Sequence, residues 1–161
     1  MRTFILSLTK PVALPALWQD IMVSIPRLIC GYFMAFNFGA AKFGMPWSDS
    51  KLNLGFFEVA YWFPSDVAEF GGIFAQFPSF FAWMGAFSEA VGGLLLMLGF
   101  QTRIASLLIF CTMMVAAFCQ QLQNGYWNML PALGFGFICI YTFALGSGRL
   151  GVDYLITKKT K

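Results

Sequence analysis

One carboxylate lies near the middle of a long apolar segment. Glu89 is the only ionisable residue between positions 80 and 100, in the sequence FFAWMGAFSEAVGGLLLMLGF. A hydrocarbon core of about 30 Å requires roughly 20 apolar residues of helix, so this segment predicts a membrane span. A charge at the centre of a span costs about 2.5–3.5 kcal/mol on insertion scales, so it usually faces a partner or a polar cavity. Glu89 is therefore either half of a structural ion pair or part of a ligand or proton site.

The residues that could help Glu89 lie in an earlier apolar segment, which contains Arg27, Asn37 and Lys42. Counting about 1.5 Å of helix rise per residue, Arg27 lies at a depth from which its long side chain reaches the level of Glu89. We therefore expect an Arg27–Glu89 pair, with Asn37 as a neighbour. Lys42 lies near the other boundary, where it could snorkel to water. A Lys42–Glu89 pair would require a tilted or shorter first span.

The composition indicates an integral membrane protein. The chain has 161 residues, of which 59% are hydrophobic and 11% are charged, whereas soluble domains carry about 25% charged residues. We expect one membrane domain, residues 1–161. The absence of histidine excludes His-ligated haem and the commonest general base. No motif predicts a metal or cofactor site, and no basic run predicts nucleic-acid binding. The cysteines form no CxxC pair and lie in apolar segments, which favours buried thiols: Cys30, Cys111, Cys119 and Cys139.

Hydropathy predicts an all-α, four-helix membrane bundle. Its spans are residues 21–41, 80–100, 104–119 and 127–145. The outer loop, residues 43–79, is too apolar for a free loop and too short to cross the bilayer. We expect it to form two short interfacial helices, the second opening with Asp66 as N-cap and Glu69 three residues later.

Basic residues predict the orientation, since they gather on the cytoplasmic side of membrane proteins. With both termini cytoplasmic, Lys42 and Lys51 are the basic residues left on the outer side. The cytoplasmic side then carries Arg2, Lys10, Arg27, Arg103, Arg149, Lys158, Lys159 and Lys161.

Small residues predict how the first two spans pack. Gly31 and Gly39 lie on one face of the first span, and Gly85 and Gly93 flank Glu89 on the second. Such stripes let two helices approach closely within a membrane. After the fourth span, the sequence GSGRLGVD stops the helix; we expect Arg149 to face the cytoplasm and Asp153 to pair with it.

These motifs together resemble the DoxX family of small bacterial membrane proteins. Arg27 and Leu28 followed by Gly31, Gly39 and Lys42 are similar to the first-span pattern of the family. Residues 88–108, SEAVGGLLLMLGFQTRIASLL, resemble its second-span signature, and GSGRLGVD resembles its closing motif. The resemblance covers nearly the whole chain apart from the N-terminal arm and the outer loop.

The resemblance implies a multi-pass protein of the bacterial cytoplasmic (inner) membrane. Some relatives are the membrane subunit of a thiosulfate:quinone oxidoreductase, and others join complexes that link thiol or superoxide metabolism. Carried over by position, the charged motif residues are Arg27, Lys42, Glu89 and Arg103.

Three functions remain open. In the first, the protein is an auxiliary subunit of a quinone-linked redox complex, with partner subunits carrying the electrons and Glu89 near the quinone head. In the second, it is a small transporter or lipid-handling protein. In the third, it is a scaffold for a larger membrane assembly. Catalysis by this chain alone is the least favoured reading, because no nucleophile–base arrangement is present.

Overall fold

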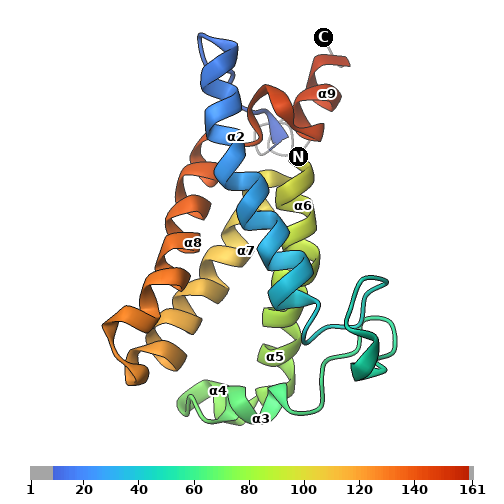
Figure 1. Cartoon of the computed structure of the whole chain (residues 1–161), viewed down its shortest axis with the longest axis vertical. Helices are drawn as coiled ribbons and strands as arrows, with labels where there is room; N and C mark the ends of the chain where they lie inside the picture. The colour runs from blue at the N-terminus through green and yellow to red at the C-terminus, as the bar shows by residue number, and fades with distance from the viewer. Residues whose placement is uncertain (1–8, 160–161) are drawn as a thin grey trace.

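The computed structural model describes residues 9–159, which form a helical bundle (Figure 1). The prediction of an all-α protein with four candidate membrane spans is confirmed. In the described residues, the only β-type pairing is a single bridge between Phe43 and Val59. The helices long and apolar enough to cross a membrane are Leu17–Gly39, Pro78–Leu98, Thr102–Asn124 and Tyr126–Leu145.

The orientation of the bundle in the membrane stays a prediction. Arg2 and Lys161, which contributed to it, lie outside the described residues.

Each of the first two spans is an α-helix with a π-helical segment inside or at its end. The first consists of α2 (Leu17–Tyr32) and the π-helical η1 (Phe33–Gly39). The second consists of α5 (Pro78–Phe87), the π-helical η3 (Ser88–Gly92) and α6 (Gly93–Leu98). Pro78 suits a first helical position, where its missing N–H is not needed.

The last two spans form a helical hairpin. The third consists of α7 (Thr102–Val115), the π-helical η4 (Ala116–Gln121) and the 3-10 turn η5 (Leu122–Asn124). The expected third span, residues 104–119, was too short, because the polar residues after position 119 continue the same helix. The fourth span is α8 (Tyr126–Leu145). Gly99 ends the second span in the left-handed conformation, with φ 67°, which glycine adopts without steric cost.

The two ends of the bundle differ, as Figure 1 shows. The described N- and C-terminal segments, including η6 (Gly148–Leu150) and α9 (Val152–Lys159), lie at one end, which we call the termini end. The short helices α3 (Phe63–Ala68) and α4 (Gly72–Gln76) lie across the other, which we call the loop end. Toward the loop end α5 separates from α7 and α8, and α3 and α4 lie below this divergence.

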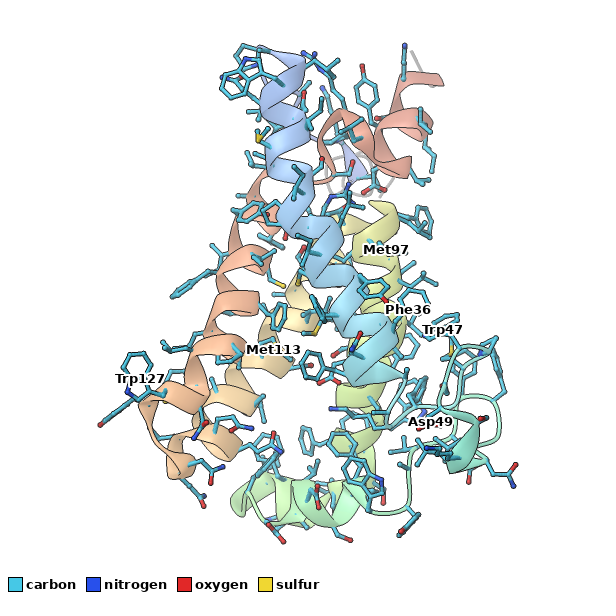
Figure 2. The ribbon with its side chains drawn as sticks, in the orientation of Figure 1. Phe36, Trp47, Asp49, Met97, Met113 and Trp127 are labelled. Carbon is cyan, nitrogen blue, oxygen red and sulfur yellow. The ribbon has the colours of Figure 1, made fainter. Side chains whose placement is uncertain are left out.

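The outer loop contains two short helices, as expected, although they begin elsewhere. Asp66 is not an N-cap: it lies inside α3, whose first turn begins after Trp62 and contains Pro64. Proline preorganises a first helical turn, and its position decides where this helix starts. A 3-10 turn, η2 (Ser50–Leu52), precedes these helices. Trp47 ties the loop to the first span: its indole N–H donates to Ala35 O at 3.1 Å, and its ring lies against Phe36 (Figure 2).

The packed core runs along the inside of the bundle. Its fully buried members come from all four spans: Cys30, Met34, Leu96, Ala105, Ile109, Ala117 and Cys139. This core fixes the helices that position the residues described next.

Candidate functional site: a buried ion pair between two cavities

Glu89 lies in the π-helical segment η3, in the middle of the second span. A π-helical turn inside an α-helix adds a residue to the turn and re-aims the side chains around it; such turns are frequent at functional sites. The side chain of Glu89 is 5% exposed. A buried carboxylate requires a cation or several hydrogen-bond donors nearby.

The cation beside Glu89 is Lys42. Its Nζ lies 2.7 Å from Glu89 Oε2, and the lysine side chain is 16% exposed. The same Nζ lies 4.7 Å from the centroid of the Phe63 ring, within the range of a cation–π interaction. Lys42 therefore links the first span, the acid on the second span and the α3 helix at the loop end.

The expected Arg27–Glu89 pair is wrong, and the register of the two helices explains why. A Cβ at Gly31 would lie 2.6 Å from Met97 N, and one at Gly39 would lie 2.5 Å from Ala90 Cα. The antiparallel helices therefore meet with position 39 beside 90 and position 31 beside 97. Lys42, just after the helix, falls beside Glu89, whereas Arg27 falls at the far end of α6.

Arg27 instead closes the termini end of the bundle. Its Nη1 donates to the carbonyls of Leu96 at 2.6 Å and Met97 at 2.9 Å, and its Nη2 donates to that of Leu150 at 3.2 Å. The residue is 1% exposed. Carbonyls at a helix C-terminus lack intrahelical partners, so the guanidinium satisfies the end of α6 and joins it to the closing segment.

The other residues expected to matter in the first two spans take three different positions. Gly93 packs as expected, since a Cβ there would lie 2.6 Å from Ala35 N. Gly85 does not, because its nearest neighbour would be the Phe63 ring at 3.8 Å, an ordinary contact. Asn37 is exposed and does not line the cavities at the ion pair.

A first cavity, of about 260 Å³, opens beside the ion pair between α5, α7 and the short loop-end helices. Its walls are mainly apolar and aromatic. Ser88 and Thr112 share a hydrogen bond in its lining, and Gln120 is exposed. The residues that give the cavity its chemistry are Lys42, Phe63, Phe70, Phe74, Phe81, Ser88, Glu89, Cys111, Thr112 and Gln120.

A second cavity, of about 320 Å³, reaches the same ion pair from the side of α8. The two cavities share Lys42, Glu89, Ala116 and Gln120 in their linings. The ion pair is thus the wall between two spaces and not part of the packed core. Small-molecule sites usually measure roughly 300–1,000 Å³, so each space approaches the size that holds a ring or a chain.

The residues expected to form a cytoplasmic motif make other contacts than predicted. Asp153 does not pair with Arg149. Its carboxylate accepts from Gln101 N at 2.8 Å, Thr102 N at 3.0 Å and Thr102 Oγ1 at 2.9 Å, which caps the start of α7. The partner of Arg149 is Asp20, with Nε 3.2 Å from Oδ2. Arg103 donates to Ala144 O at 3.3 Å.

Asp20, Ser88 and Thr112 were missed by the sequence analysis. Asp20 precedes the expected first span by one residue, and its burial to 1% exposure could not be read from that position. A signal for Ser88 and Thr112 did exist, since both are hydroxyls inside apolar segments, one of them adjacent to Glu89.

The cysteines divide by position. Cys30 and Cys139 are buried and Cys111 is exposed, which departs from the expectation that all four are buried. Within residues 9–159, no group of three or more cysteine or acidic side chains could hold a metal ion.

Comparison with known proteins identifies the family. Residues 22–121 match the model of the DoxX family. None of the curated proteins and none of the solved structures matches the chain. The match extends from the first span to the end of the third, and it includes both Lys42 and Glu89. Since it covers well over half of the 161 residues, the chain belongs to the DoxX family of integral membrane proteins.

Proposed function

We propose that this protein is an auxiliary membrane subunit of a quinone-linked redox complex, and that the first cavity holds the quinone head. The observation that carries the proposal is the Lys42–Glu89 pair in the wall of an apolar, aromatic cavity. A pair that served packing alone would be expected in a filled core, because protein interiors are close-packed. Here two cavities border it.

The residues present fit a quinone. Its carbonyl oxygens need hydrogen-bond donors, which the Lys42 ammonium and the Gln120 amide can supply. The reduced form carries hydroxyl groups, for which the Glu89 carboxylate is an acceptor. Aromatic rings suit a flat ring placed between them, and the cavity offers Phe63, Phe70, Phe74 and Phe81.

A bound quinone supplies two-electron chemistry coupled to two protons. In the proposal, this chain binds and orients the ring and exchanges protons at Glu89, while electrons pass to or from a partner subunit. The exposed outer loop, with Phe56 at 67% and Tyr61 at 89% exposure, offers a surface for such a subunit at the loop end.

A photoreactive azidoquinone tests the proposal. The protein, purified in mild detergent with its native lipids, is illuminated with the probe, and the labelled peptides are mapped by mass spectrometry. We expect labelling in the second span between Phe81 and Glu89 and in the third span between Leu108 and Gln120, suppressed by excess unlabelled quinone. Copurification of a redox subunit and endogenous quinone is also expected.

Glu89→Gln is the informative variant, and Glu58→Gln in the outer loop is its matched control. A hydrogen bond to a charged group contributes about 1.5–3 kcal/mol, so loss of the carboxylate should weaken binding of the reduced quinone, whose hydroxyl donates to it, roughly tenfold or more. Glu58→Gln should not change it. Labelling spread evenly over lipid-facing helices, or protection of the labelled peptides by reduced quinone that is equally strong in Glu89→Gln and in the wild type, contradicts the proposal. Altered assembly without loss of binding would favour a scaffold, and lost solute flux in vesicles with an intact fold would favour a transporter.

A further inference from the structure

The second cavity differs from the first in the chemistry of its walls. It lies between the first span, the π-helical η4 and α8. Methionine and phenylalanine line its deep part, where Met113 lies near the middle of the bundle (Figure 2). At the loop end the lining contains three side-chain amides, those of Gln120, Gln121 and Asn128.

These amides provide hydrogen-bond partners for water at the loop end of the cavity. Gln120 and Asn128 are exposed and Gln121 is partly exposed. A water molecule needs two to four polar partners and roughly 10–15 Å³ of probe volume. A space of about 320 Å³ therefore has room for a file of waters, with amide partners at one end and the ion pair at the other.

The opposite direction is closed. Between the ion pair and the termini end, α2 and α6 touch backbone to backbone at Gly31 and Gly93. Leu96, Ile109 and Cys139 are fully buried there. At the termini end itself, Arg27 is hydrogen-bonded to three carbonyls. Both cavities that reach Glu89 are thus bordered by loop-end residues and not by termini-end ones.

We propose that the second cavity is an aqueous access path through which the Glu89 carboxyl exchanges protons with the medium at the loop end, and with that medium alone. The inference goes beyond the quinone proposal, because it holds whatever the first cavity binds. In the forward step, a proton moves from water in the path to the carboxylate, which becomes neutral. In the reverse step, the carboxyl returns the proton to water.

Few charged groups take part in this exchange. Among the described residues that line the two cavities, the ionisable ones are Lys42, Glu89 and Cys111. Lys42 is the cation that faces Glu89, and its Nζ lies 4.7 Å from the centroid of the Phe63 ring. Cys111 lines only the first cavity. The face of α8 contributes an amide, and α3 contributes apolar and aromatic side chains.

Dicyclohexylcarbodiimide tests the sidedness. This reagent crosses membranes and reacts with protonated carboxyl groups. The protein is reconstituted into vesicles in one sorted orientation, and the pH is set separately inside and outside. The quantity measured by mass spectrometry is the loss of free Glu89 carboxyl, whether as reagent adduct or as an amide to Lys42. Glu89→Gln is the negative control, and exposed Glu58 reports the pH at the loop end.

Acidifying the loop-end compartment should raise the rate of Glu89 modification several-fold, and acidifying the other compartment should leave it unchanged. Modification that follows the termini-end pH, that responds equally to both sides, or that never occurs at any pH overturns the proposal.

A pair of variants identifies the route. Ala132→Leu narrows the second cavity, and Val115→Leu narrows the first. The proposal expects a several-fold slower response of Glu89 in Ala132→Leu and a normal one in Val115→Leu. The reverse result places the access path in the first cavity and refutes the assignment.

A thiol experiment covers the case in which Ala132→Leu does not fold. With Cys111 and Cys119 replaced by alanine, Ala132→Cys places a thiol in the wall of the second cavity alone, and Ala105→Cys places one in the core of α7. A charged, membrane-impermeant thiosulfonate added at the loop end should modify the first and not the second. An unreactive thiol at position 132 means that water does not enter the second cavity and overturns the proposal.

Discussion

Removing the charge of Lys42 tests how much this lysine stabilises the buried Glu89 carboxylate. Lys42→Met keeps the length of the side chain and removes its charge, which leaves a carboxylate that is 5% exposed without a cation. Breaking a buried ion pair by removing one partner costs about 3–5 kcal/mol. We expect a loss of that size in the free energy of unfolding.

The reciprocal change should cost less. In Glu89→Gln the lysine keeps its 16% exposure and its contact with the Phe63 ring, so we expect a loss of about 1–2 kcal/mol. The double variant Lys42→Met/Glu89→Gln has no buried charge left to neutralise. Since replacing a whole buried pair is often nearly neutral, we expect it to lose about 0–1 kcal/mol.

The assay is reversible unfolding by sodium dodecyl sulfate in mixed micelles, followed by circular dichroism. Lys51→Met, at an exposed lysine of the outer loop, is the matched control and should stay within about 0.5 kcal/mol of the wild type. The losses of the single variants should together exceed that of the double variant by about 3–7 kcal/mol. Simple additivity, with a coupling below about 0.5 kcal/mol, would refute the pairing.

The deficit of Lys42→Met should also depend on pH. A buried carboxylate without a partner escapes its desolvation cost by binding a proton. Proton binding becomes easier as the pH falls, so the variant should be closest to wild type at acidic pH and furthest from it at alkaline pH. A deficit that is constant across this range would show that the carboxylate stays ionised in a polar environment.

Three further changes test the rest of the structure by the same unfolding measurement. Gly93→Ala puts a methyl group 2.6 Å from Ala35 N and should lower the free energy of unfolding by about 1–3 kcal/mol. Gly134→Ala, whose methyl group meets nothing within 4 Å, should lower it little. Equal losses in the two variants would contradict the close helix contact. Asp153→Asn weakens the cap of α7 and should cost about 1–2 kcal/mol, with faster amide exchange at Gln101 and Thr102 as its local sign. Arg27→Lys cannot bond all three carbonyls that the guanidinium reaches, and wild-type stability in this variant would show that those bonds are dispensable.

The parts of the structure set by apolar patterning could be predicted from the sequence. Four apolar segments give four spans, and Gly31 and Gly93 mark where two of them touch. The importance of Glu89 as a buried group also followed from its position, because an acid in the middle of an apolar segment has few ways to be stable.

The partner of Glu89 could not be predicted from depth counting. That reasoning assigns each residue a height from a presumed membrane boundary, but the register between two helices is set by which small residues meet. Gly39 meets Ala90, and the π-helical segments η1 and η3 add residues to turns that the counting treats as regular. In the observed register Lys42 lies against Glu89, and Arg27 lies against the end of α6.

The closing segment shows a similar limit. Arg149 and Asp153 lie four residues apart, a spacing that predicts an ion pair between them. Instead each bonds a distant element, Asp20 for the arginine and the start of α7 for the aspartate. Contacts between segments so far apart in the sequence leave no local pattern from which they could be predicted.

The contact between Lys42 and Glu89 can be measured directly in a lipid bilayer by magic-angle-spinning NMR. With ¹⁵N in the lysine ammonium and arginine guanidinium groups and ¹³C in the glutamate carboxyls, dipolar dephasing reports which nitrogen lies against Glu89. The account predicts strong dephasing of the Glu89 carboxyl by a lysine nitrogen, lost in Lys42→Met and retained in Arg27→Lys. Dephasing by an arginine nitrogen, or none at all, would contradict it.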